Sequence, residues 1–342
     1  MLILAREAVG LTQKELADKL SIPNSVLSKY ESGVREPTAK HLCAIADELG
    51  VTVAFFELSE RRFQFGSSCT YHRRRQDVTV ARLRKLLAEI NVLRIHLARL
   101  LQGIEIDSPI EIPRMDIEDY GGDVNRIAQL ARMQMHVSPG PIPNLIQLIE
   151  SAGGIVVHRP FDTPKLDAVS QWMPGMPPVF LLNSEAPVDR QRFTLAHELG
   201  HLIMHRTPTE SIEKEADEFA AEFLMPAKDI GDDLDGLRSS SLRPLKLKWR
   251  TSMASIIRRA FDLNRIDERM YRAHFTALSK SGYRMREPNI LEGEQPSLFD
   301  KILDIYLHEL SYSEGDLCEL LRISPGSLYR YYALGVPELK LA

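Results

Sequence analysis

The stretch Arg192-Phe-Thr-Leu-Ala-His197-Glu198-Leu-Gly-His201-Leu-Ile-Met-His205 decides how the middle of this chain folds. Its apolar residues recur at helical spacing, which predicts one continuous helix. Residues four apart share a helix face, so His197 and His201 can direct their imidazole nitrogens at one metal ion. Glu198 can reach a water molecule on that metal rather than the metal itself. The pattern therefore predicts a Zn²⁺ site with a general base beside it.

A third metal ligand must come from a second segment of the chain. Thr207-Pro-Thr-Glu210 has the form of a helix-capping box and predicts a helix that runs to about Leu224. Glu213 on this helix can complete a His-His-Glu site and leave the fourth position to water. Asp217, one turn later, can accept a hydrogen bond from a ligand histidine. Glu215 is the alternative ligand, but no acid follows it four residues later.

Two nearby features have less specific patterns. His205 lies eight residues after His197, on roughly the same side of the helix, and can contact a ligand histidine or the substrate, or be a surface histidine. Val179-Phe-Leu-Leu-Asn183 predicts a strand shortly before the histidine-bearing helix. The edge of such a strand could take an extended peptide by strand addition, or the apolar run could be plain core.

Two segments, Phe193–His201 and Glu213–Pro226, resemble the ImmA/IrrE metallopeptidases, a gluzincin-like family of zincins, over roughly residues 123–270. The resemblance implies that the second helix supplies Glu213 as the third ligand of Zn²⁺. It also implies a selective protease whose substrate is a particular protein, such as a repressor or an antitoxin.

The N-terminal part of the chain predicts two helices joined by a tight turn. Thr12 suits the N-cap of the first helix, and Ser21-Ile-Pro23 makes the turn. The second helix begins at Asn24 and ends before Gly33, which suits the position after a helix. This is the helix-turn-helix geometry, in which the second helix enters the major groove of DNA. The alternative is an ordinary helix pair that binds protein.

This part resembles the lambda-repressor-like (XRE) helix-turn-helix family over residues 2–57. The residues that carry the resemblance are Ala5, Arg6, Gly10, Leu11, Thr12, Gln13, Leu16, Ala17, Leu20, Ser28, Tyr30, Glu31, Gly33 and Pro37. By that resemblance, Arg6 and Glu31 form a structural ion pair. The residues that would contact the double-stranded DNA operator are Gln13 at a phosphate and Asn24, Ser25, Ser28 and Lys29 at the bases.

Composition limits the classes of protein that this chain can be. A length of 342 residues predicts two or more domains, and 44% hydrophobic with 26% charged residues is typical of globular proteins. A net charge of −4 excludes binding to nucleic acid by overall charge alone. No run of about 18 apolar residues or signal peptide is present, which excludes a membrane span. Three isolated cysteines suit the reducing cytoplasm.

We divide the chain into four regions on these patterns. They are a helix-turn-helix domain (1–58), a basic helical connector (59–122), a zinc peptidase domain (123–229) and a helical C-terminal region (230–342). The expected fold class is mainly α with a small β-sheet (α+β). Ten basic and two acidic residues between positions 61 and 99 give a local charge of +8, which could reach DNA phosphates or form a solvated helix face.

The connector also carries a seam of apolar residues spaced three and four apart. The seam consists of Leu83, Leu86, Ile90, Leu93, Leu97 and Leu100. It could pair two chains into a homodimer or pack onto the chain's own next domain. Near the C-terminus, residues 313–331 repeat the apolar pattern of residues 12–30, which predicts either a second helix-turn-helix-like unit or a plain helical hairpin.

Together these patterns predict a cytoplasmic, DNA-binding transcriptional regulator that carries a zinc-dependent endopeptidase. The alternative is a transcription factor whose zincin-like domain is a non-catalytic sensing, dimerisation or antitoxin-type binding module. An intact Glu198 favours catalysis, because a sensor does not need a general base.

Overall fold

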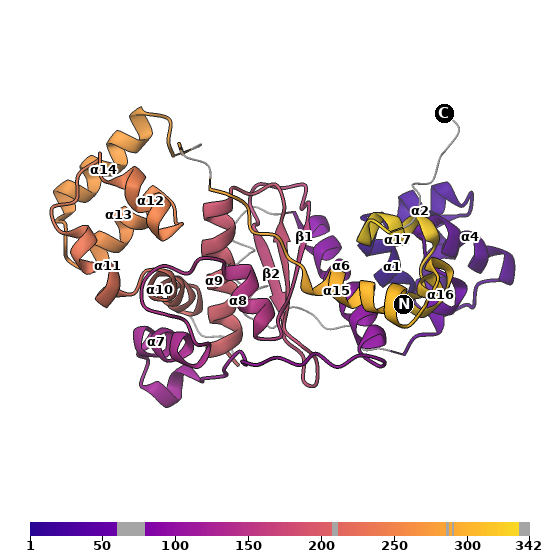
Figure 1. Ribbon diagram of the computed structural model, residues 1–342. Helices are drawn as coiled ribbons and strands as arrows, with labels where there is room; N and C mark the ends of the chain where they lie inside the picture. The colour runs from indigo at the N-terminus through magenta and orange to yellow at the C-terminus, as the bar shows by residue number, and fades with distance from the viewer. Residues whose placement is uncertain (60–78, 207–210, 285–286, 289–290, 335–342) are drawn as a thin grey trace. The chain divides into compact units, whose positions relative to one another are not determined.

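The computed structural model describes residues 1–59, 79–206, 211–284, 287–288 and 291–334, which Figure 1 traces along the chain. The chain divides into two compact units. The first unit holds both ends of the described chain, up to Ile106 and from Leu298 onward, and the second holds Asp107–Ser297. The second unit is therefore inserted into the first. The expected fold class, mainly α with one small sheet, is confirmed.

The N-terminal helices of the first unit form the predicted helix-turn-helix. Its elements are α1 (Leu2–Ala8), α2 (Gln13–Lys19), α3 (Asn24–Glu31), α4 (Ala39–Leu49) and the 3-10 turn η1 (Val53–Glu57). The Thr12 hydroxyl accepts a hydrogen bond from the Glu15 amide, and the Glu15 carboxylate accepts one from the Thr12 amide. This capping box begins α2. Gly33, at φ 72°, follows α3, and Arg6 pairs with Glu31 at 2.5 Å between Nε and Oε1.

Helix α6 (Val80–Leu100) belongs to the same unit and contributes Ala88, Val92 and Ile95 to its core. The six residues of the predicted leucine seam on α6 are all buried, none more than 7% exposed. The seam is thus covered in the single chain, so pairing of two chains through it stays a prediction and would require the covering groups to move. Residues 60–78, which include half of the basic side chains counted above, lie outside the described residues.

The end of the chain returns to the first unit. Its elements are α15 (Leu298–Asp304), the π-helical turn η4 (Ile305–Glu309), α16 (Glu314–Leu321) and α17 (Pro325–Tyr332). The Tyr306 hydroxyl donates a hydrogen bond to the Leu100 carbonyl at 2.6 Å, which joins η4 to the last turn of α6. None of the described helices is both long and apolar enough to cross a bilayer.

The second unit contains a three-stranded sheet in the order β1-β3-β2. Strand β3 (Val179–Asn183) pairs in parallel with β1 (Ile155–Arg159) and antiparallel with β2 (Ala168–Gln171). All five residues of β3 are buried. Because β3 is the central strand, the expectation that this run offers a free edge is wrong, and the core alternative is confirmed. The two edge strands of the sheet are β1 and β2.

Helices cover this sheet and build the rest of the second unit. They are the 3-10 turn η3 (Ile117–Tyr120), α7 (Val124–Gln134), α8 (Leu145–Ser151), α9 (Val188–Met204), α10 (Ile212–Leu224), α11 (Ala227–Leu234), α12 (Leu242–Trp249), α13 (Met253–Asp262) and α14 (Glu268–Lys280). Helix α9 lies between the sheet and α10 (Figure 1). The predicted capping box at Thr207–Glu210 lies outside the described residues, and α10 ends at Leu224 as expected.

Helices α9 and α10 approach closely because α9 has a glycine, Gly200, where the two helices touch. A Cβ atom on Gly200 would lie 2.8 Å from Cδ1 of Phe219, nearer than packed atoms allow. Phe219 is fully buried and stacks on Phe223, one turn later on α10, with ring centroids 5.3 Å apart. The aromatic face of α10 thus packs directly on the backbone of α9.

Buried ion pairs fix α9 along its N-terminal half. Arg192 pairs with Glu294, whose carboxylate also accepts hydrogen bonds from the first backbone amides of α8. Lys246 on α12 is 2% exposed and lies between the carboxylates of Asp189 and Glu287, at 2.5 and 2.8 Å. These bonds outweigh burial and raise the pKa of Lys246, so its charged form belongs to the fold.

We expect Lys246→Met to destabilise the second unit by about 3–5 kcal/mol, because it leaves two carboxylates facing each other without their cation. Lys248→Met on the same helix is the control. Lys248 is 51% exposed in its pair with Asp233, so its loss should cost about 1 kcal/mol or less. Urea unfolding followed by tryptophan fluorescence measures both, since Trp172 and Trp249 lie in the second unit. Equal losses in the two variants would contradict this account.

Candidate metal centre

Three predicted ligands, His197 and His201 on α9 and Glu213 on α10, meet at one point. The Nε2 atoms of the two histidines are 3.0 Å apart. Glu213 Oε2 lies 3.5 Å from Nε2 of His197, and its Oε1 lies 3.4 Å from Nε2 of His201. Tetrahedral zinc with bonds of 2.0–2.1 Å holds its ligand atoms about 3.3 Å apart. The spacing and the two-nitrogen, one-carboxylate donor set therefore fit Zn²⁺.

The site is enclosed on one side and open on the other. The His201 side chain is 3% exposed and that of His197 is 14% exposed, whereas the Glu213 side chain is 35% exposed. Access is therefore from the side of α10. Three protein ligands and an accessible fourth position are the pattern of catalytic rather than structural zinc sites.

Each histidine of the site has a partner at its other ring nitrogen. Asp217 Oδ1 lies 2.8 Å from Nδ1 of His197, as the spacing on α10 predicts. Nδ1 of His205 lies 3.0 Å from Nδ1 of His201. The His205 side chain is 1% exposed, so the surface alternative for this residue is wrong. Such partners fix the tautomer and orientation of metal ligands.

Glu215, the alternative third ligand, points elsewhere. Its Oε2 lies 3.0 Å from Nε2 of His205, and its Oε1 accepts a hydrogen bond from the Ser211 hydroxyl at 2.7 Å. Glu215 therefore extends the chain of contacts that begins at His201. The sequence alone does not show this role, because a carboxylate on a helix face has many possible partners.

Glu198, the predicted general base, is 1% exposed. Its Oε2 accepts a hydrogen bond from the Ser170 hydroxyl at 2.6 Å. Ser170 comes from the edge strand β2, so one wall of the site is the sheet edge. Glu198 directly follows His197 on α9, and its negative charge acts to raise the pKa values of His197 and His201. The sequence does not indicate this role for Ser170, because nothing there distinguishes it from other serines.

The three histidines of the metal-free site have different pKa values. Burial lowers the pKa of His201, and burial together with the charge of His201 lowers the pKa of His205 to about 4. Burial also opposes charge on His197, but hydrogen bonds to Asp217 and Glu213 outweigh it and raise the His197 pKa to about 9. The two histidines likewise overcome burial and lower the pKa of Glu213. At neutral pH a protonated His197 thus stands beside an ionised Glu213.

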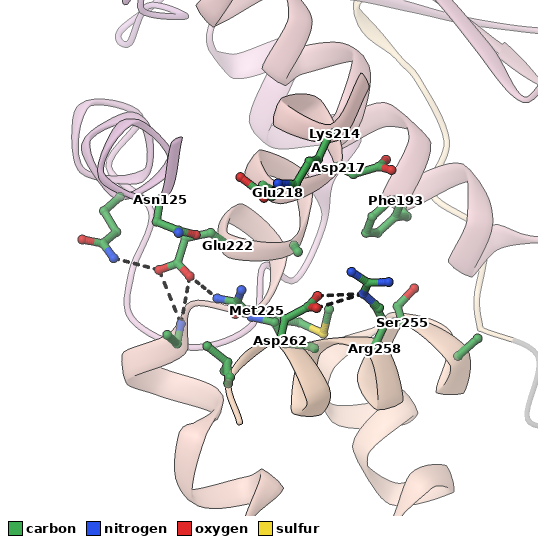
Figure 2. A pocket seen from close by; sticks show the side chains of 16 residues that line it. Asn125, Phe193, Lys214, Asp217, Glu218, Glu222, Met225, Ser255, Arg258 and Asp262 are labelled. Carbon is green, nitrogen blue, oxygen red and sulfur yellow. Dashed lines mark hydrogen bonds and ion pairs between the residues drawn. The ribbon is translucent and has the colours of Figure 1, made fainter. Parts of the chain in front are cut away.

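A pocket of about 810 Å³ lies beside α10. Asp217 and Phe193, one helical turn before His197, line it (Figure 2). Across the pocket Arg258 pairs with Asp262, with Nε 2.9 Å from Oδ1. Asp217 thus contacts a candidate ligand histidine and also forms part of the pocket wall.

The predicted DNA contacts lie together on α3 and α2. The four on α3 are all exposed, namely Asn24, Ser25, Ser28 and Lys29. Gln13, at the start of α2, is half-buried and donates a hydrogen bond to Glu31 Oε2 at 2.8 Å. The proposed base-contacting residues therefore form one accessible helix face, while Gln13 is tied to the Arg6–Glu31 pair.

We expect zinc binding to the metal-free protein to release about one proton at pH 7. Metal binds neutral imidazole, whereas a pKa of about 9 keeps His197 protonated at that pH. Zinc affinity should rise about tenfold per pH unit until the pH reaches this pKa and then level off. Calorimetry in buffers of different ionisation enthalpy counts the protons. Asp217→Asn should release fewer, and a binding enthalpy independent of the buffer at pH 7 would contradict this expectation.

Two family models match the chain, one in its N-terminal part and one in the part that holds the candidate metal centre. Residues 2–56 match the helix-turn-helix model, and residues 150–261 match the model of the IrrE N-terminal-like domain. The second match includes the three candidate ligands and Glu198. A search of curated proteins found no match. The chain thus joins an XRE-type helix-turn-helix to a domain of the IrrE/ImmA metallopeptidase type.

Proposed function

We propose that this chain is a DNA-binding regulator that also acts as a zinc-dependent endopeptidase on a specific protein, such as a repressor or an antitoxin. The observation that carries the proposal is the convergence of His197, His201 and Glu213, with Glu198 beside them. A site that only held zinc for structural reasons would have four protein ligands and no need of a neighbouring base.

The proposed reaction is hydrolysis of a peptide bond. A divalent cation held by the three ligands would polarise the scissile carbonyl and acidify a water molecule. Glu198 removes a proton from the attacking water and passes it to the leaving nitrogen. The Ser170 hydroxyl holds the Glu198 carboxylate in place. Asp217 and His205 orient the two ligand imidazoles.

The substrate would bind as an extended segment. Strand β2 lies at the edge of the sheet and carries Ser170, which contacts the general base. A peptide that adds alongside β2 would bring its backbone to the same place. Side chains beyond the cleaved bond could enter the pocket lined by Phe193 and Asp217. Such a pocket would favour particular sequences and so support selectivity for one protein.

A specific observation favours the alternative of a non-catalytic module. Glu198 is almost fully buried, and Ser170 already occupies one of its oxygens. A domain that senses metal or binds an antitoxin-like partner would tolerate this arrangement, whereas a protease must let water reach the carboxylate. Both functions use the same metal ligands, so only the role of Glu198 separates them.

The comparison of wild type with Glu198→Gln tests the protease. Because glutamine cannot accept the proton, we expect zinc content to stay unchanged and cleavage to fall by about 10²-fold or more. New protein N-termini in cells that express either chain reveal cleavage even while the substrate is unidentified. Glu268→Gln on α14, an exposed acid that pairs with Arg272 and does not line the pocket beside α10, is the control and should behave as wild type.

Identical sets of N-termini from wild type and Glu198→Gln would contradict the protease and leave the sensing or binding module. Loss of zinc from Glu198→Gln would mean that this residue holds the metal rather than the water.

For the DNA-binding half, we propose that the exposed face of α3 enters the major groove of an operator in the cytoplasm. The amide of Asn24 and the hydroxyls of Ser25 and Ser28 suit base edges, and Lys29 suits a phosphate or a guanine. With a net charge of −4 for the whole chain, attraction to DNA must come from local groups such as Lys29.

A further inference from the structure

The last two helices of the described chain reproduce the N-terminal helix-turn-helix. An offset of 301 residues carries the bounds of α3, Asn24–Glu31, onto those of α17, Pro325–Tyr332. The same offset carries the Thr12 capping box of α2 onto a capping box at Ser313 in α16. In each box the acid three residues later accepts a hydrogen bond from the N-cap amide, Glu15 at 2.7 Å and Asp316 at 2.8 Å.

The turns between the helices also agree. Ser21 and Arg322 both adopt the left-handed conformation, at φ 54° and 60°. One residue later, the amides of Ile22 and Ile323 donate to the carbonyls of residues 17 and 318, both at 3.0 Å. The apolar contacts between the helices come from equivalent positions, which are Leu16 with Leu317 and Leu27 with Leu328, all at most 1% exposed. The pair α16–α17 is thus built as a helix-turn-helix.

Most of the groups suited to DNA are replaced in α16 and α17, and of the equivalent positions only Arg330 keeps a cation, that of Lys29. The position of Gln13 is taken by Glu314, whose charge repels phosphate. Asn24 and Ser25 are replaced by Pro325 and Gly326, which have no side-chain hydrogen-bonding group. The exposed charged side chains of α16 are all acidic, namely Glu314, Asp316 and Glu319. The charge of the α16 surface is therefore opposite to that of a surface that contacts DNA phosphates.

The turn and the start of α17 are instead used for protein contact. Ile323, 1% exposed, forms an antiparallel bridge with Val51 just after α4. The Thr52 amide donates to the Arg322 carbonyl, and the Ser324 amide donates to the Gly50 carbonyl, both at 3.0 Å. These backbone bonds occupy the end of the pair at which a recognition helix would meet DNA.

One close approach and two further contacts join α16 and α17 to α4 and α6. Gly50 ends α4 at φ 67°, and a Cβ there would collide with the Ser327 hydroxyl. On the α6 side, the Tyr332 hydroxyl lies 2.5 Å from Nδ1 of His96, and Arg99 donates to the Leu320 carbonyl. The second helix-turn-helix is thus held on both α4 and α6, within one compact unit.

We propose that residues 313–332 are a helix-turn-helix whose partner is protein rather than DNA, and that its partner is the N-terminal helix-turn-helix domain of the same chain, which it braces. This rests on the DNA-binding half of the proposed function and not on the protease. The DNA-binding unit is then complete only when its N-terminal and C-terminal segments, which precede and follow the second unit in the sequence, have packed together.

One experiment asks which helix-turn-helix contacts DNA. Lys29 and Arg330 are equivalent exposed cations on α3 and α17. The full-length chain is titrated with a mixed-sequence duplex at low salt, where phosphate contacts dominate binding. We expect Lys29→Ala to weaken binding and to reduce the salt slope by about 1, and Arg330→Ala to change neither. A loss in Arg330→Ala equal to that in Lys29→Ala would overturn the proposal.

If neither variant loses affinity for DNA, the proposed function, in which α3 contacts DNA, is contradicted.

A separate measurement tests whether residues 313–332 stabilise the N-terminal helix-turn-helix domain. Hydrogen exchange of the full-length chain compares Gly50→Ala with Gly33→Ala. Both glycines follow a helix at similar positive φ, but only Gly50 meets Ser327, and nothing lies within 4 Å of a Cβ on Gly33. The two substitutions therefore differ in the contact and not in the backbone strain.

We expect Gly50→Ala to speed exchange throughout α16 and α17 by about tenfold or more, because it separates them from α4. Gly33→Ala should affect only the end of α3. Ser327→Ala, which removes the colliding hydroxyl, should restore protection to the Gly50→Ala chain and also guards against a simple failure to fold. Unchanged protection of α16 and α17 in Gly50→Ala, or equal effects of the two glycine substitutions, would overturn the brace.

Discussion

The close contact between α9 and α10 at Gly200 and Phe219 is the constraint on which the metal centre depends. Two histidines on one helix can share a face by periodicity alone, but the third ligand must be delivered by another helix at a fixed distance. The absence of a side chain at Gly200 sets that distance, and the Phe219 ring fills the space. Buried ion pairs at Arg192 and Lys246 hold α9 against the rest of the unit, so the ligands keep their spacing without a loop to position them.

Helical periodicity explains why the positions of the three candidate ligands and of Asp217 could be predicted, since their relation depends on spacing within two helices. Contacts across the fold could not be predicted in the same way. Ser170 meets Glu198 only because the sheet packs on α9, and a serine in a short strand has no distinctive pattern. Glu215 is a possible ligand by its place on α10 but pairs with His205, since sequence spacing does not show which partner a helix-face carboxylate finds. The run 179–183 was ambiguous because a buried central strand and a buried edge have the same apolar composition.

The order of the units along the sequence relates the metal centre to the helix-turn-helix. The DNA-binding unit is formed from both ends of the chain, and the unit with the metal centre is inserted between α6 and α15. Both covalent connections of the inserted unit therefore lead to elements that support the helix-turn-helix. The repeat of the N-terminal apolar pattern near the C-terminus could be found in the sequence, but the bridge between Val51 and Ile323 could not, because it joins residues from opposite ends of the chain.

We propose that His197, His201 and Glu213, rather than Glu215, hold one zinc ion. The zinc content of the purified chain after dialysis, measured by mass spectrometry for wild type, Glu213→Ala and Glu215→Ala, tests this ligand set. We expect about one zinc ion per chain in wild type and Glu215→Ala, and loss of zinc from Glu213→Ala. Zinc retained by Glu213→Ala but lost from Glu215→Ala would contradict it.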